Sequence, residues 1–202
     1  MYIKKTLKFK NINKMKNIKN TFRKVYRGLR NKISDKEIHQ MSLDIANNCN
    51  KMSIWNKKMF HLFLTIPELK EVETSYIISL LQGRGKKIAV PKVCSKTSLK
   101  NFLLTDFTII EQSKIGIFQP KNGIQIDSKK IDVVFVPLLV YDINGNRIGY
   151  GKGYYDNFLK SCNNDCLKIG LSFFPPEEKL IPSNKRDIRI DYCVTPSRIY
   201  QF

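Results

Sequence analysis

The sequence lacks acidic residues over its first 34 positions, which carry twelve lysines and arginines. The remaining 168 residues carry 24 basic and 17 acidic residues, so much of the net charge of +19 lies at one end. Lysine, asparagine and isoleucine are also favoured by A/T-rich coding sequences. The charge therefore gives little reason to expect nucleic-acid binding, although a polyanionic small ligand stays compatible with it.

Long apolar runs are also absent. No stretch of 18 apolar residues exists, which predicts that the chain has no membrane partner. The start, "MYIKKTLKFKNINKMKN", lacks the apolar core of a secretory signal, and it lacks the arginine and serine of a mitochondrial presequence. We therefore expect a basic extension over residues 1–16, a single domain over 17–202 and a cytoplasmic location. A mitochondrial location is the alternative.

Residues that bind zinc are scarce. The five cysteines form no CxxC pair and only His39 and His61 are present, so no zinc spacing exists. Reduced structural thiols are expected. We expect His39 to be exposed, His61 to be a core histidine with its hydrogen bonds satisfied, and Trp55 to serve packing.

Hydrophobic spacing predicts helices alternating with strands. Apolar residues at steps of three and four predict a helix over 17–33, and Lys19, Arg23, Arg27 and Arg30 follow the same spacing. "SDKE" is a capping box that opens a second helix, from Ser34 to about Asn48. "TSYIISLLQGRG" predicts a third helix stopped by Gly83 and Gly85.

Strands are expected at 59–66, at "KKIAVPKV", over the continuous apolar run 133–141, at 168–174 and at 191–196. The run 133–141 has the composition of a central strand covered on both faces. Together these patterns predict an α/β fold, a single three-layer domain with a mostly parallel central sheet flanked by helices.

Glycine is rare, with 10 residues in 202, yet three lie within five positions of "NRIGYGKGYYDNFL". "Asn144-Gly145" before it predicts a type I′ hairpin turn. Gly149, Gly151 and Gly153 precede a helical stretch, where backbone N–H groups and the helix dipole favour an anion. The loop matches neither the Walker A nor the dinucleotide pattern, so a phosphate loop and a purely structural turn both stay open.

The longer stretch "VVFVPLLVYDINGNRIGYGKGYYDNFL" resembles the signature of the 5-formyltetrahydrofolate cyclo-ligase family, departing at Leu138, where glycine is usual, and conservatively at Ile148. "KNTFRKVYR", "KEVETSYI", "GIFQP" and "KRDIRIDYCVTPSRI" resemble other family segments in the correct order. The resemblance spans roughly residues 19 to 199.

The resemblance implies an ATP- and Mg²⁺-dependent closure of 5-formyltetrahydrofolate to 5,10-methenyltetrahydrofolate, with release of ADP and phosphate. The formyl oxygen attacks the γ-phosphate, the neighbouring anilino nitrogen closes the ring, and phosphate leaves. Positioning and charge stabilisation are then the main tasks of the protein.

The resemblance also implies residue roles. Catalysis falls to Arg147, Lys152 and Tyr154, and the metal ligands are Asp156 and Asp187. ATP would be bound by Lys19, Arg23, Arg147, Ile148, Gly149, Tyr150, Gly151, Lys152, Gly153, Tyr154 and Tyr155. The folate would be bound by Leu64, Glu71, Tyr150, Gly151, Lys152, Gly153 and Tyr154.

Several alternatives stay open. Glu73 rivals Glu71 for the pterin ring, Glu68 is a third choice, and Phe118 faces either the folate or the core. Another ATP-dependent phosphoryl-transfer enzyme, or a nucleic-acid-binding module that uses the basic start, would also fit parts of the sequence. We expect a monomer. Surplus lysines predict a preference for polyglutamylated folate, which equal affinity for mono- and polyglutamate forms would contradict.

Overall fold

The structure is a computed structural model that describes residues 2–113 and 116–202, with side chains described from Lys14 onward. Its helices are α1 (Tyr2–Asn31), α2 (Asp35–Asn50), α3 (Ser75–Gly83) and α4 (Tyr154–Ser161), with short 3-10 turns η1 (Pro67–Leu69) and η2 (Ser128–Lys130). Within these residues, no helix combines the length and apolarity needed to cross a membrane.

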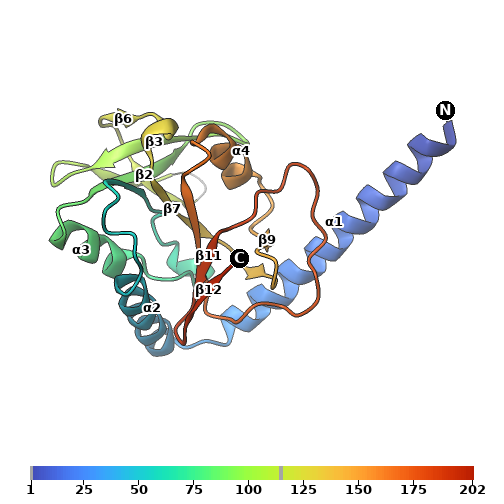
Figure 1. The fold of residues 1–202 in the computed structure, drawn as a ribbon, viewed down its shortest axis with the longest axis horizontal. Coiled ribbons are helices and arrows are strands. Elements are labelled where there is room, and N and C mark those ends of the chain that lie inside the picture. Colours follow the sequence, from blue (N-terminus) through green and yellow to red (C-terminus); the bar gives the residue numbers. More distant parts are fainter. Residues whose placement is uncertain (1, 114–115) are drawn as a thin grey trace.

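One sheet of eight strands forms the centre of the protein (Figure 1). Its spatial order is β12 (Ile199–Gln201), β11 (Tyr192–Val194), β10 (Leu167–Leu171), β7 (Val133–Pro137), β1 (Met59–His61), β2 (Lys87–Val93), β3 (Leu99–Leu104) and β6 (Gln125–Ile126). The five strands from β11 to β2 are parallel, and the outer strands are antiparallel. Two small sheets pair β4 (Ile110–Gln112) with β5 (Phe118–Pro120), and β8 (Val140–Tyr141) with β9 (Arg147–Ile148).

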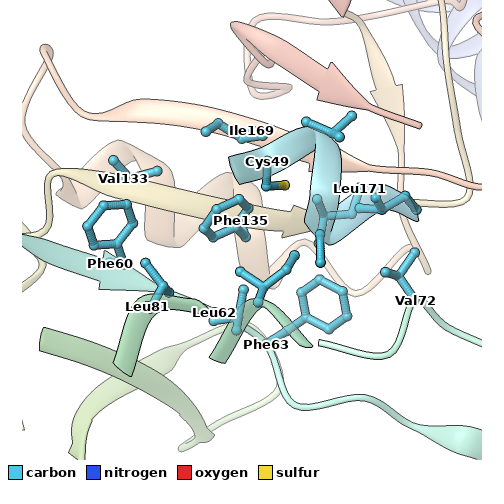
Figure 2. Close-up of a cluster of buried hydrophobic side chains, with 14 of the residues drawn as sticks. Cys49, Phe60, Leu62, Phe63, Val72, Leu81, Val133, Phe135, Ile169 and Leu171 are labelled. Atoms are coloured by element: carbon cyan, nitrogen blue, oxygen red, sulfur yellow. The ribbon is translucent and has the colours of Figure 1, made fainter. Parts of the chain in front are cut away.

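The two faces of the sheet are covered by different helices. Because successive side chains of a strand point to opposite faces, Val133 and Phe135 enter the cluster that packs against α2 and α3 (Figure 2). Val134 and Val136 enter the opposite cluster, which includes Phe158 of α4. The predicted three-layer α/β architecture with a mostly parallel sheet is confirmed.

Helix α1 begins earlier than predicted. It runs from Tyr2 instead of Asn17 and ends at Asn31, two residues before the expected end. The first 27 residues contain neither proline nor glycine, so nothing interrupts the helical backbone between the basic start and the rest of the helix. Phe22 and Tyr26 pack against Leu139, Val140 and Ile148, and this contact fixes α1 against the domain.

Helix α2 begins as predicted. Ser34 caps it, the Glu37 backbone N–H donates to the Ser34 hydroxyl, and the Glu37 carboxylate accepts from the Ser34 backbone N–H. Its end lies two residues beyond the predicted Asn48. Helix α3 stops at Gly83, as the glycines predict.

Four predicted strands are shorter than expected: 168–174 is a strand over Leu167–Leu171, 191–196 is one over Tyr192–Val194, and the other two end early in the sheet. The segment 59–66 is a strand only over Met59–His61, and the rest leaves the sheet as a loop. The run 133–141 breaks after Pro137, and Val140–Tyr141 pairs with Arg147–Ile148 in a separate hairpin. The apolar pattern was misleading here because Leu138 and Leu139 are buried without belonging to the central sheet.

The hairpin turn is also of another type. Gly145 has φ +73° and its N–H donates to the Asp142 carbonyl, whereas Asn144 does not have a positive φ. A type I′ turn needs positive φ at both central residues, so this is a type I turn followed by a left-handed glycine. A Cβ on Gly145 would lie 2.7 Å from the Ile190 carbonyl oxygen, which explains the glycine.

Candidate active site

A cleft of about 820 Å³ opens at the carboxyl ends of β1, β2 and β7. It is bounded by α1, the loop after β1, the segment from β9 to the start of α4, the β4–β5 hairpin and the segment 184–187. Ligands of open α/β sheets bind outside the carboxyl ends of parallel strands. A cleft of this size and position is therefore the natural place for a substrate site.

Every residue to which the resemblance gives a role lines this cleft; the rival Glu73 does not. The set comprises Lys19, Arg23, Leu64, Glu71, Arg147, Ile148, Gly149, Tyr150, Gly151, Lys152, Gly153, Tyr154, Tyr155, Asp156 and Asp187. The fold brings them together from α1, the loop after β1, and two segments near the C-terminus. Their individual roles stay predictions.

The glycine loop is shaped by its contact with α1. Gly151 has φ +96°, and a Cβ there would lie 3.0 Å from Arg23 Cζ. Arg23 Nε donates to the Gly149 carbonyl oxygen at 2.9 Å. Gly153, with φ +73°, is the N-cap of α4. The glycines thus let an arginine side chain lie against the backbone and start a helix whose first residues line the cleft.

Acidic side chains in this region are already paired with basic ones. Arg147 Nη1 lies 3.0 Å from Asp156 Oδ1, and Lys19 Nζ lies 2.6 Å from Asp187 Oδ2. Asp156 also accepts from the Ile188 N–H, and Asp187 from the Asn184 N–H. Among the residues that the structure describes, no group of three or more His, Cys, Asp or Glu side chains forms a metal site.

Glu71 lies deep in the other part of the cleft. It is 4% exposed and accepts from the Ile66 N–H at 2.9 Å. Burial raises the pKa of this carboxyl group above its usual value, while a hydrogen bond from the Tyr150 hydroxyl, the Ile66 N–H and the charge of Arg30 oppose that rise. Glu71 is therefore a carboxylate held at an apolar wall, with few polar partners.

The two rival glutamates are placed differently from Glu71. Glu73 does not line the cleft; it lies 3.1 Å from His39, in a neighbouring groove. Glu68 lines the cleft at an exposed position on η1. Only Glu71 combines burial with access to the cleft. Leu64 and Phe118 line the cleft beside it and provide apolar surface for a flat ring.

Sequence reasoning overlooked Arg30 as a site residue, although the helical stripe contained it. It is 2% exposed, donates from Nη1 to the Tyr150 hydroxyl at 2.9 Å, and donates from Nη2 to the Leu138 carbonyl at 2.5 Å. Its burial depends on how α1 packs against the rest of the chain. The basic spacing alone therefore does not distinguish it from the exposed Arg27.

Asp142, the first aspartate of the stretch "VVFVPLLVYDINGNRIGYGKGYYDNFL", was also given no role. It is fully buried, and its two oxygens accept from the N–H groups of Asn144, Asn146 and Ile181 and from the Asn146 amide. These bonds close the turn that leads to Arg147. The role of Asp142 is thus to shape the hairpin that carries the glycine loop.

His61 lies beneath the start of α4. It is fully buried, and its Nε2 lies 3.1 Å from the Tyr155 hydroxyl. Burial lowers its pKa to about 3, so the ring is neutral at ordinary pH. Its Nδ1 has no partner among the described residues, so the expectation of a fully satisfied core histidine is wrong for one of its two nitrogens.

The expectations for His39, Trp55 and the cysteines are confirmed. His39 is largely exposed, Trp55 stacks on Phe60 in the core, and all five cysteines are free thiols.

The chain is similar to known proteins along most of its length. Residues 15–196 match the model of the 5-formyltetrahydrofolate cyclo-ligase family. A Schizosaccharomyces pombe protein named "Probable 5-formyltetrahydrofolate cyclo-ligase" is 28% identical, over 90% of this chain and 96% of its own. The Mus musculus 5-formyltetrahydrofolate cyclo-ligase is 30% identical, over 67% of this chain and 72% of its own.

A solved structure is similar in fold. The Aquifex aeolicus 5,10-methenyltetrahydrofolate synthetase superposes with a TM-score of 0.79 at 26% identity, covering 91% of this chain and 92% of that one.

Proposed function

The chain belongs to the 5-formyltetrahydrofolate cyclo-ligase family, and we propose that its cleft catalyses the ATP-dependent closure of 5-formyltetrahydrofolate to 5,10-methenyltetrahydrofolate. One observation carries this proposal. A glycine loop at a helix start, flanked by Lys19 and Arg23, shares a single cleft with the buried carboxylate of Glu71. The first feature suits a polyphosphate, and the second suits a ring with paired N–H donors.

The reaction balances within this cleft. The formyl oxygen attacks the γ-phosphorus of ATP and ADP leaves, so the poor leaving oxygen of a formamide becomes a phosphate ester. The anilino nitrogen then attacks the formyl carbon, the carbon–oxygen bond breaks, and phosphate departs with the proton that the nitrogen loses. Because both nitrogens belong to one substrate, the ring closure is already intramolecular, and positioning supplies much of the acceleration.

The glycine loop would hold the triphosphate. Backbone N–H groups around Gly151 and Gly153 offer donors at the N-terminus of α4, and Lys152 adds a mobile charge. Lys19 and Arg23 approach from α1, where the Arg23 guanidinium already touches the loop. These groups, with Arg147, would stabilise the charge that develops on the transferred phosphoryl group.

The folate would lie toward Glu71. Its carboxylate would accept hydrogen bonds from the pterin edge, while Leu64, Tyr150 and Tyr154 would contact the ring faces. The Tyr154 ring centroid lies 5.9 Å from Lys152 Nζ, so Tyr154 would stand between the triphosphate and the folate.

Asp156 and Asp187 fit a magnesium ion chemically. Magnesium prefers oxygen ligands and is commonly held by one or two carboxylates together with substrate phosphates, so the absence of a larger acidic group in the described residues is compatible with it. When bound, Mg²⁺ would offset the negative charge of the triphosphate. The two aspartates would exchange their present partners, Arg147 and Lys19, for that ion.

The test is absorbance at the methenyl-folate band after mixing the protein with 5-formyltetrahydrofolate, ATP and Mg²⁺. We expect a rise for the wild type, about 100-fold slower for Lys152→Ala and also slower for Asp156→Asn. Lys160→Ala and Asp165→Asn, both exposed and outside the cleft, are matched controls and should behave as the wild type. A flat wild-type trace from a folded protein that binds ATP would instead favour another phosphoryl-transfer reaction.

A further inference from the structure

A buried arginine connects three segments behind the cleft. Arg30 lies on α1, and its Nη1 donates to the Tyr150 hydroxyl in the glycine loop. Its Nη2 donates to the Leu138 carbonyl, at the point where the chain leaves β7. The guanidinium also lies 5.9 Å from the ring centroid of Phe173. Arg30 itself does not line the cleft, so any effect on the substrate must pass through a neighbour.

The direction of these hydrogen bonds is fixed by chemistry. A guanidinium has donors and no acceptor, so the Tyr150 oxygen must accept from Arg30 and its own proton is free to be donated elsewhere. Tyr150 and Glu71 line the same cleft, and the nearby Tyr150 hydroxyl lowers the pKa of the Glu71 carboxyl group. Arg30 can therefore act on Glu71 through Tyr150.

We propose that Arg30 is a positioning residue for the folate: its hydrogen bond fixes the Tyr150 hydroxyl at the end of the cleft where the buried carboxylate of Glu71 would bind the pterin ring. This inference rests on the proposed function, because it assigns Glu71 to the substrate. A protonated Glu71 would present one acceptor fewer to the paired N–H donors of the ring. Arg30 thereby determines folate affinity without touching the folate.

Few other charges act on Glu71. The hydroxyl of Tyr155 faces it from α4, and burial together with the Glu71 charge raises the pKa of that hydroxyl group. Glu68 on η1 is exposed, and Glu73 is occupied by His39 on the outer side. The charge of Arg30 lowers the Glu71 pKa, although by less than the Tyr150 hydroxyl and the Ile66 N–H do. Removing Arg30 should thus raise the Glu71 pKa further.

An arginine is required by the geometry. Two separate nitrogens of one planar fork reach the Leu138 carbonyl and the Tyr150 hydroxyl, which a lysine ammonium on a flexible chain does not reproduce. Arg30→Lys keeps the charge and loses the fork, whereas Arg30→Met loses both. The two variants separate charge from position.

The test measures KM for 5-formyltetrahydrofolate and for ATP separately, over a range of pH. At neutral pH, Arg30→Met should raise the folate KM about tenfold and leave the ATP KM within about twofold. The acid limb of kcat/KM for folate should move to higher pH. Arg30→Lys should raise the folate KM selectively while the acid limb stays near its wild-type position.

Two controls isolate the action of Arg30 through Tyr150. Arg84→Met removes a surface arginine that lies over Trp55, outside the cleft, and should change neither KM. In a double-mutant cycle, Arg30→Met and Tyr150→Phe should be non-additive for folate affinity, because both remove the hydrogen bond between the two side chains. Thermal unfolding of each variant shows whether it is folded, and Arg30→Lys carries the test if Arg30→Met does not fold.

The proposal would be overturned if Arg30→Met changed both KM values equally, left the acid limb in place and was additive with Tyr150→Phe. Arg30 would then be a packing residue. If only Arg30→Lys can be measured, the proposal would be overturned by an unchanged folate KM, or by an ATP KM that rises as much as the folate KM. A wild type that fails to cyclise the folate is a different result: it refutes the proposed function, and the role of Arg30 toward the folate with it.

Discussion

The two ends of the cleft are built in different ways. The loop end, which consists of Arg147–Asp156 with Lys19, Arg23 and Asp187, is made of backbone and of ion pairs that are partly exposed. The Glu71 end, which consists of Glu71, Leu64 and Phe118 with Arg30 behind it, combines partly buried apolar side chains with two buried charged groups, Glu71 and Arg30. The loop end has partners to exchange with a ligand, whereas the Glu71 end is fixed before a ligand arrives.

This difference matches the ligands proposed for each end. A triphosphate with Mg²⁺ carries its own charges and can replace the pairs between Lys19 and Asp187 and between Arg147 and Asp156. A neutral pterin ring brings no such charge, so its recognition depends on a carboxylate kept ionised in an apolar wall. Substitutions should therefore affect ATP use at one end and folate affinity at the other.

The largest effect is expected for Gly151→Ala at the loop end. A methyl group would meet the Arg23 guanidinium at 3.0 Å, and the residue would keep φ +96°, a strain of about 1–2 kcal/mol. Steady-state kinetics should show kcat/KM for ATP reduced about 100-fold or more. Gly28→Ala, in an open position on α1, is the control and should retain full activity. Normal ATP use by Gly151→Ala would show that the loop end is not shaped by this contact.

The next effect concerns Glu71→Gln. We expect a folate KM roughly 100-fold higher, with an ATP KM close to the wild type. Glu73→Gln, in the neighbouring groove, should change neither value. A higher ATP KM in Glu71→Gln would contradict the separation between the two ends.

The same substitution should stabilise the ligand-free protein. The folded-state pKa of Glu71 is raised by burial, so its contribution to stability is present below the ordinary carboxyl pKa and is lost as pH rises through the folded pKa. At neutral pH, Glu71→Gln removes this cost, and its Tm should exceed that of the wild type. The gain should disappear in acid.

A smaller effect is expected for Asp187→Asn. The Mg²⁺ concentration needed for half-maximal activity should rise about tenfold, while the free energy of unfolding changes by less than about 1 kcal/mol because the pair with Lys19 is partly exposed. Asp191→Asn breaks a lysine–aspartate pair outside the cleft, with Lys168, and should leave the Mg²⁺ dependence unchanged. An unaltered Mg²⁺ dependence of Asp187→Asn would remove it from the metal site.

The smallest effect on activity is expected at His61, below both ends. Its pKa is lowered to about 3, so its contribution to stability is present above the ordinary histidine pKa and is lost as pH falls from about 6.5. Between pH 6.5 and 5, the free energy of unfolding of the wild type, measured in urea, should fall by about 2 kcal/mol more than that of His61→Gln. For His39→Gln, at an exposed position, the free energy of unfolding should fall by as much as in the wild type.

Local patterns alone determined several elements. The capping box of α2, the stop of α3 at Gly83 and the glycine-rich start of α4 depend on residues a few positions apart, so the sequence contains the whole cause. The resemblance to the cyclo-ligase family also indicated which residues would meet in one cleft, because its matching segments extend along nearly the whole chain.

The tertiary structure decided the rest, because those features depend on residues far apart in the chain. The hydrogen bond from Arg30 to Tyr150 joins positions 120 residues apart, and the contact of Arg23 with the loop is similarly distant. Glu71 and Glu73 have the same chemistry, but only Glu71 is buried and lines the main cleft. The apolar run 133–141 predicted burial correctly. It did not predict that the strand ends at Pro137, where α1 packs against Leu138 and the following residues pair in the β8–β9 hairpin. Burial follows from composition, whereas the partner of each buried group follows only from the packed chain.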